Sequence, residues 1–128
     1  MNPATLALVG LVGGAGACGA LTRYLLTRVI AERSGSSFPW GTLLINVTGA
    51  FLIGLFAGLA SRHILNVFAQ TVLITGFLGG YTTFSTMSWE SIQLVRGGNR
   101  LLTLLYLGGN MGPGLLAALL GLLMGGWL

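Results

Sequence analysis

The sequence has no lysine and very little charge of either sign, with six arginines and only two acids, Glu32 and Glu90. Charged residues make up 6% of its 128 residues, whereas soluble domains carry about 25%. A folded monomer with so little charge would not stay in water. We therefore expect an integral membrane protein without a soluble catalytic domain.

Residues that build catalytic and metal sites are equally scarce. Cys18 is the only cysteine, which excludes an intramolecular disulfide, and His63 is the only histidine. The sequence contains no carboxylate pair, no metal-ligand cluster and no phosphate loop, so we expect no enzyme. Its arginines are scattered near the ends of apolar segments, which is typical of a membrane interface rather than of a nucleic-acid surface.

Long apolar runs fill the rest of the chain, which is 54% hydrophobic. About 20 apolar residues cross a bilayer as a helix. The runs predict an all-α protein with a single domain over residues 1–128 and four transmembrane helices, at about residues 5–27, 39–60, 64–95 and 101–127. The third is too long for one straight crossing, which indicates a break near residues 79–83.

The third segment combines Gly79-Gly80 with a cluster of hydroxyl side chains. These are Tyr81, Thr82, Thr83, Ser85, Thr86 and Ser88. Backbone polar groups at membrane depth must be satisfied inside the protein or beside a cavity, and Gly-interrupted membrane helices are typical of ion and substrate sites. In the alternative interpretation the hydroxyls bond to their own helix and the glycines only allow close packing.

Other polar residues recur at helical spacing within the apolar segments. Thr42 and Asn46 share one helical face, and so do Tyr106 and Asn110. Asn46 fits two roles equally well, an interhelical hydrogen bond or a pore lining. With the hydroxyls and aromatic ring edges these groups suit a small anion, whereas carbonyls at a helix break suit a monovalent cation.

Two ionisable residues near the segment ends each have two interpretations. Arg23 either extends to the membrane interface or lines a vestibule. Glu90 either caps the second half of the broken helix, which we favour, or relays protons.

The glycine content and the arginine distribution bear on assembly. The chain has 22 glycines spread over every segment, so we expect a thin bundle whose pore needs a second copy. The first and third connections hold four arginines and the second holds only Arg62. The positive-inside rule then favours a cytoplasmic location for the first and third connections.

The motif Gly-Gly-Tyr-Thr-Thr-Phe-Ser-Thr-Met at residues 79–87 resembles the signature of the Fluc (CrcB-type) fluoride channels. The stretch Gly-Thr-Leu-Leu-Ile-Asn-Val at residues 41–47 and Gly19-Ala20-x-x-Arg23-Tyr24 are similar to the family's second-helix motif and first-helix end. The resemblance covers essentially the whole chain.

This resemblance implies a passive channel that exports fluoride across the cytoplasmic (inner) membrane of a microbe. It implies an antiparallel, dual-topology homodimer with two pores and a central structural sodium ion, held by the carbonyl oxygens of Gly79 and Thr82. The implied fluoride pathway comprises Thr42, Asn46, Phe84, Ser85, Thr86, Met87, Tyr106 and Asn110. Arg23 and Glu90 match vestibule or structural positions.

Three departures from the family pattern bear on these expectations. Met87 stands where many members have a second phenylalanine, and Gly114 stands where a hydroxyl is usual. The uneven arginines fit poorly with insertion in both orientations, so an oppositely oriented homologue is an alternative partner.

The alternative function is a proton-coupled small multidrug transporter, but that class needs an acid in the first helix, and residues 5–27 have none.

Overall fold

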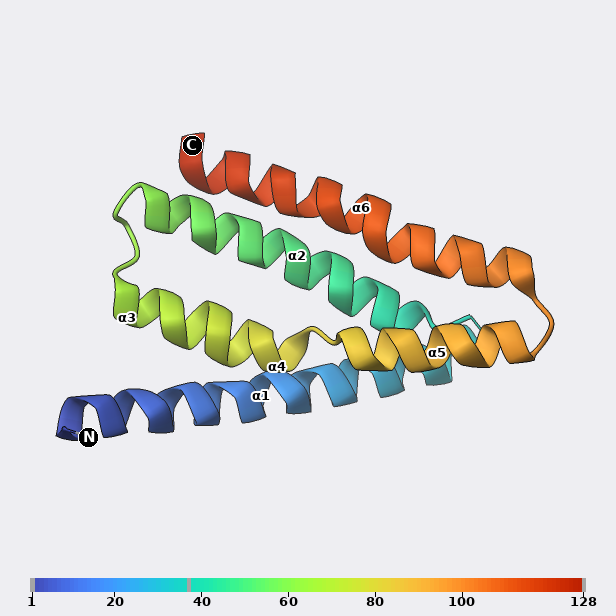
Figure 1. Cartoon of the computed structure of the whole chain (residues 1–128), viewed down its shortest axis with the longest axis horizontal. Helices are drawn as coiled ribbons and strands as arrows, with labels where there is room; N and C mark the ends of the chain where they lie inside the picture. The colour runs from blue at the N-terminus through green and yellow to red at the C-terminus, as the bar shows by residue number, and fades with distance from the viewer. Residues whose placement is uncertain (1, 37, 128) are drawn as a thin grey trace.

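The computed structural model describes residues 2–36 and 38–127, except for the side chains of Ser85, Thr86 and Trp127. Every regular element in this part of the chain is helical, which confirms the all-α expectation. The elements are α1 (Pro3–Ser34), α2 (Trp40–Ser61), α3 (Val67–Gln70), the π-helix η1 (Thr71–Leu78), α4 (Gly79–Tyr81), α5 (Phe84–Arg96) and α6 (Arg100–Trp127). The segments run back and forth, and both chain ends lie at the same end of the bundle (Figure 1).

Within the described residues, three helices are long and apolar enough to cross a membrane. They are α1, α2 and residues Arg100–Gly126 of α6. The run formed by α3, η1 and α4, Val67–Tyr81, is apolar but shorter. The chain is therefore a multi-pass membrane protein, and the expected fourth crossing, which would combine this run with α5, stays a prediction.

Helix α1 continues past the end expected at Thr27. Residues 28–34, which the sequence placed in the connection after the first helix, add turns that are stabilised by an exposed ion pair between Arg28 and Glu32 (3.2 Å). Pairs at this i, i+4 spacing support a helix by about 0.2–0.5 kcal/mol. The helix ends at Gly35, whose left-handed backbone (φ 59°) closes it by a bond to the Ala31 carbonyl.

The break in the third segment lies at Thr82 and Thr83. The backbone becomes extended at Thr82 (ψ 155°), and α5 begins at Phe84. Gly79, expected in the break, has ordinary helical dihedrals (φ −61°, ψ −36°), and a Cβ there would meet only the Ile74 oxygen, at 3.7 Å. The glycine pair therefore does not make the break.

Gly80 instead allows a close approach between two helices. A Cβ built on it would overlap the carbonyl oxygen of Gly16 on α1. Gly19 and Phe77 meet in the same way one turn further along, because a Cβ on Gly19 would overlap the Phe77 carbonyl. The backbones of α1 and the η1–α4 run are therefore in direct contact, as small residues permit in membrane proteins.

The pair α2 and α6 is packed on the same principle. A Cβ on Gly54 would overlap the Ala118 carbonyl, and one on Gly121 would overlap the Phe51 carbonyl. The buried core, Ile45, Leu78 and Tyr81, lies where α2 meets η1 and α4. The bundle thus has two tightly paired layers with α2 between the third segment and α6 (Figure 1).

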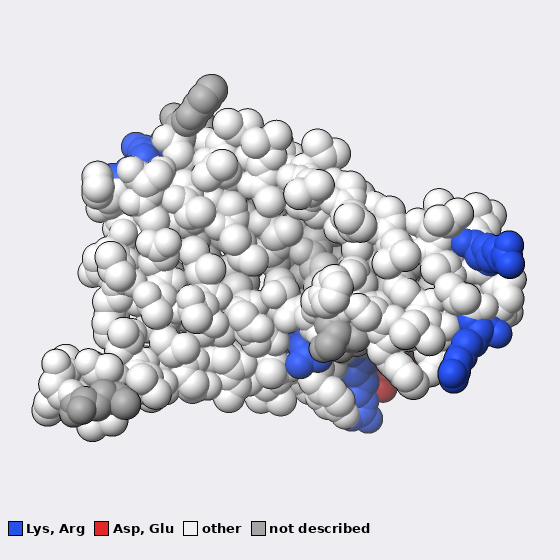
Figure 2. Space-filling view, in the orientation of Figure 1, with Lys and Arg blue, Asp and Glu red and all other residues white. Residues whose placement is uncertain are grey.

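The charged side chains are confined to the ends and one edge of the visible face, and the rest of that face is uncharged (Figure 2). The α1–α2 and α5–α6 connections lie at one end of the bundle and the α2–α3 connection at the other (Figure 1). The first end holds Arg33, Arg96 and Arg100, and the other end holds Arg62. The structure thus reproduces the uneven arginine distribution on which the topology prediction depends.

Candidate functional site

The side chain of Asn46, on α2, reaches the break in the third segment. Its Oδ1 accepts a hydrogen bond from the Thr83 N–H (3.2 Å), and its Nδ2 donates to the Thr83 carbonyl (3.4 Å). In an unbroken helix the Thr83 N–H would bond to the carbonyl four residues earlier, that of Gly79. The Asn46 Oδ1 atom therefore takes the place of the Gly79 carbonyl as the acceptor for the Thr83 N–H at the break.

A second amide continues this contact to α6. Asn46 Nδ2 donates to Asn110 Oδ1 (2.8 Å), and Asn110 Nδ2 donates to the Tyr106 carbonyl (2.8 Å). Asn110 and Tyr106 are both buried. The expected polar residues of α2 and α6 are thus brought together beside the break.

Tyr106 also brings a hydroxyl group to this region. The side chain is fully buried, packs edge-on against Phe38 with 5.5 Å between ring centroids, and lies near Thr42 and Asn110. Within the described part of the chain its hydroxyl makes no hydrogen bond. Because buried hydroxyls normally have a partner, this one is a donor that remains available.

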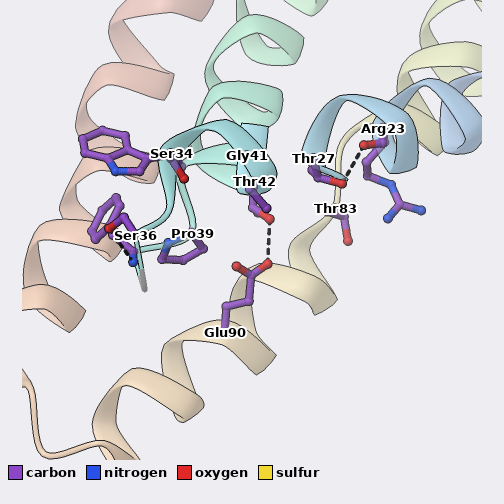
Figure 3. A pocket seen from close by; sticks show the side chains of 12 residues that line it. Arg23, Thr27, Ser34, Ser36, Pro39, Gly41, Thr42, Thr83 and Glu90 are labelled. Atoms are coloured by element: carbon purple, nitrogen blue, oxygen red, sulfur yellow. Dashed lines mark hydrogen bonds between the residues drawn. The ribbon is translucent and has the colours of Figure 1, made fainter. Parts of the chain in front are cut away.

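Glu90 and Thr42 meet at the wall of a cavity of about 310 Å³. Thr42 Oγ1 donates to Glu90 Oε1 (2.6 Å), and the Glu90 side chain reaches from α5 towards α2 (Figure 3). Arg23 and Thr83 line the same cavity. The favoured expectation that Glu90 caps α5 is wrong, because the helix begins at Phe84 and has no acid in its first turn.

Arg23 belongs both to this cavity and to the scaffold of the break. Its Nε donates to the Gly80 carbonyl (3.2 Å), which ties α1 to α4 just before the break. Arg23 can therefore line the cavity and stabilise the scaffold at the same time, so the vestibule and structural roles that the resemblance implies for it are compatible. Sequence reasoning missed the Gly80 contact because these residues are 57 positions apart.

Phe84 and Met87 lie on the other side of the break. Phe84 is 77% exposed and, with Met87, lines an open groove of about 380 Å³ whose wall includes Asn46, Thr83 and Asn110. Thr83 lines both this groove and the cavity beside Glu90. The break is therefore the shared wall between the two hollows.

The hydroxyl cluster divides between the two interpretations that the sequence allowed. Thr82 Oγ1 donates to the Leu78 carbonyl (2.9 Å), and Ser88 Oγ donates to the Phe84 carbonyl (3.0 Å). These are the local bonds of the alternative interpretation. Tyr81 instead bonds across helices to Thr48 (2.9 Å), a pairing that the sequence did not indicate. The side chains of Ser85 and Thr86 lie outside the described residues.

The long apolar helices, the broken third segment and the polar contacts beside it define a small multi-pass helical membrane protein. A family model described as "CrcB-like protein, Camphor Resistance (CrcB)" matches residues 9–122. The chain belongs to this family, which confirms the resemblance seen in its motifs.

Curated relatives match nearly the whole chain. A protein of Aquifex aeolicus is 45% identical over 121 residues, which are 94% of this chain and 98% of the relative. A protein of Thermus thermophilus is 43% identical over 118 residues and covers 92% of this chain and 94% of the relative. Each is named "Fluoride-specific ion channel FluC". The relatives are ion channels and not enzymes, in agreement with the expectation from the sequence.

Proposed function

We propose that this chain forms a passive, fluoride-selective channel through which fluoride leaves the cell across its cytoplasmic membrane. The family and the names of the relatives support this proposal. The observation that carries it is the buried Tyr106 hydroxyl, which has no hydrogen-bond partner among the described residues. A buried donor without a partner stabilises a small anion that has left its water shell.

The proposed pathway runs along the polar residues of α2 and α6 and the start of α5. It comprises the cavity beside Thr42 and Glu90, the Tyr106 hydroxyl and the groove beside Phe84 and Met87. The edge of an aromatic ring is positive, so the exposed Phe84 ring offers an attractive contact to an anion. Ser85 and Thr86 belong to the proposed pathway through the family motif alone.

The proposed sodium ion would be held by the carbonyl oxygens of Gly79 and Thr82, which are the hard ligands that such a cation prefers. Their geometry fits this role because the Thr83 N–H bonds to Asn46 rather than to Gly79, and because the extended backbone at Thr82 turns its carbonyl away from the axis of α4. When bound, the cation would supply a fixed positive charge at the break.

The proposed active form is a dimer of antiparallel subunits. The groove beside Phe84 is open, and apolar side chains of α5 such as Trp89 and Ile92 are exposed, so one chain alone leaves the pathway without its outer wall. The partner is a second copy of this chain in the opposite orientation or, given the uneven arginines, an oppositely oriented homologue.

Fluoride efflux from proteoliposomes that contain only this chain tests the function. With a potassium ionophore to balance charge, we expect fluoride to leave and chloride to stay inside. A protonophore should leave the fluoride rate unchanged, because a passive channel moves fluoride without protons, whereas the rate of a proton-coupled transporter would change when the protonophore equilibrates protons across the membrane. Equal release of both anions, or no release of fluoride, would contradict the proposal.

A further inference from the structure

The two asparagines beside the break form a hydrogen-bond relay with one fixed direction. The Thr83 N–H can only donate, so it sets the orientation of the Asn46 amide with Oδ1 towards the break. Asn46 Nδ2 then faces Asn110 Oδ1, and Asn110 Nδ2 faces the carbonyl of Tyr106. Each amide therefore has its orientation set by the group on either side.

The hydrogen-bonding capacity of Asn46 is largely used within this relay. An asparagine amide has two N–H donors, and those of Asn46 are directed to the Thr83 carbonyl and to Asn110 Oδ1. Its oxygen accepts from the Thr83 N–H. An anion that bound to Asn46 would have to displace one of these bonds and leave its partner unsatisfied.

The position of Thr83 explains why its peptide group has to be held. Thr83 lines both the cavity beside Glu90 and the groove beside Phe84. It also stands between α4, which packs against α1, and the first residue of α5, Phe84. Movement of this peptide would change the wall that the two hollows share and the place of the Phe84 ring.

We propose that Asn46 is a positioning residue that holds the Thr83 peptide in the wall between the two hollows, and that Asn110 acts on the break through Asn46. Of the two roles that the sequence left open for Asn46, the interhelical bond is the one assigned. Asn46 is not a direct ligand of the permeating ion. The part of this inference that concerns flux rests on the proposed fluoride channel, whereas the part that concerns the break does not.

Hydrogen exchange of the Thr83 amide, measured by NMR on the full chain in micelles, tests the relay without any fluoride. Asn46→Leu removes the acceptor, and we expect exchange at Thr83 to become about tenfold faster, as for one lost buried hydrogen bond. Asn110→Leu should also accelerate exchange at Thr83, because Asn110 Oδ1 accepts from Asn46 Nδ2 and so helps to orient the Asn46 amide. Unchanged exchange in both variants would overturn the proposal.

Two further variants keep the exchange test decisive. Asn66→Leu removes an asparagine that caps α3 far from the break, so exchange at Thr83 should stay at the parent rate. Asn46→Asp retains an oxygen for the Thr83 N–H in a side chain of the same size. It should therefore keep Thr83 protected even if Asn46→Leu does not fold. Fast exchange at Thr83 in Asn46→Asp would contradict the acceptor role.

Fluoride flux then separates positioning from direct binding. If Asn110 acts through Asn46, the double Leu variant should lose no more flux than Asn46→Leu alone, and Asn110→Leu should lower the maximum rate without changing the half-saturating fluoride concentration. Two direct ligands would instead give losses that multiply and a raised half-saturating concentration, which would overturn the positioning role. Absence of flux in the parent would refute the proposed function and leave the exchange result to decide the relay.

Discussion

The two halves of the third segment, on either side of the break, are built in opposite ways. Before the break, Leu78 is fully buried, Tyr81 is nearly so, and Gly80 brings the backbone into contact with α1. After the break, Phe84 is 77% exposed and Trp89 is 59% exposed. Next to the break, the first half is packed within one chain, although Val67 and Phe68 at its start are exposed. The second half displays Phe84 and Trp89 to its surroundings.

This difference predicts different roles for the two halves of the segment. The half before the break belongs to the scaffold, and its residues should matter mainly for folding. The half after the break carries the proposed working surface, and its residues should matter mainly for flux. Variants matched across the break can contradict this division or make it more precise.

Leu78→Ala should have the largest effect on folding. The side chain is completely buried among Ile45, Tyr81 and their neighbours, and replacement of a buried leucine by alanine lowers stability by about 2–5 kcal/mol. Chemical denaturation in detergent micelles measures this change. Val67→Ala is the matched control in the same half, because Val67 is 79% exposed. Equal stability of the two variants would contradict the scaffold role.

Gly80→Ala should be the next most damaging change. Its Cβ would overlap the Gly16 carbonyl, and overpacking of this kind lowers stability by about 1–3 kcal/mol. Gly14→Ala on α1 is the control, because a Cβ there has no neighbour within 4 Å. The denaturation midpoints of the two variants decide the point. A Gly80→Ala variant as stable as Gly14→Ala would contradict the close contact between Gly80 and the Gly16 carbonyl on α1.

Met87→Phe should change flux and leave folding alone. Met87 and Phe84 are three residues apart on α5 and line the same groove. A second ring would add one aromatic contact of about 1 kcal/mol, which is at most roughly fivefold in flux. We expect the fluoride efflux rate to be maintained or increased. Loss of efflux in a variant with the parent's denaturation midpoint would contradict the favourable ring contact assigned to this position.

Thr82→Ala should have the smallest effect. The hydroxyl bonds to the Leu78 carbonyl one turn earlier, and local bonds of this kind add little to a helix. The proposed sodium site uses the Thr82 carbonyl, which alanine keeps. The stability of the proposed dimer as a function of sodium concentration should therefore match that of the parent. Loss of the sodium dependence would indicate that sodium binds to the Thr82 hydroxyl rather than to its carbonyl.

The sequence was sufficient for features that depend on local pattern. Apolar run lengths placed both ends of α2 and α6 and the start of α1 closely, but α1 continues past the expected end at Thr27 to Ser34. The Gly-Gly-hydroxyl motif located the broken segment. The spacing of Thr42 and Asn46, and of Tyr106 and Asn110, put each pair on one helical face, and the structure brings Asn46 and Asn110 into contact. Helical periodicity and chain length are enough for such predictions.

Features that depend on contacts between distant residues could not be predicted in this way. The glycine pair looked like the cause of the break, but the helix is interrupted at Thr82 and Thr83, with extended backbone at Thr82. Gly80 serves a contact with Gly16 that only packing reveals. Glu90 was expected as a cap because the start of α5 was not known. The relay through Asn46 also joins residues on three separate segments, which no local pattern specifies.

Phe84→Ile is the variant that tests the division between the two halves most directly, in one measurement of fluoride efflux per folded protein from proteoliposomes. Because the ring is mostly exposed, the denaturation midpoint should stay at the parent value. Loss of the ring edge, a contact of about 1 kcal/mol, should slow efflux roughly fivefold. A parent-like efflux rate, or a large loss of stability, would contradict the assignment of Phe84 to the working surface.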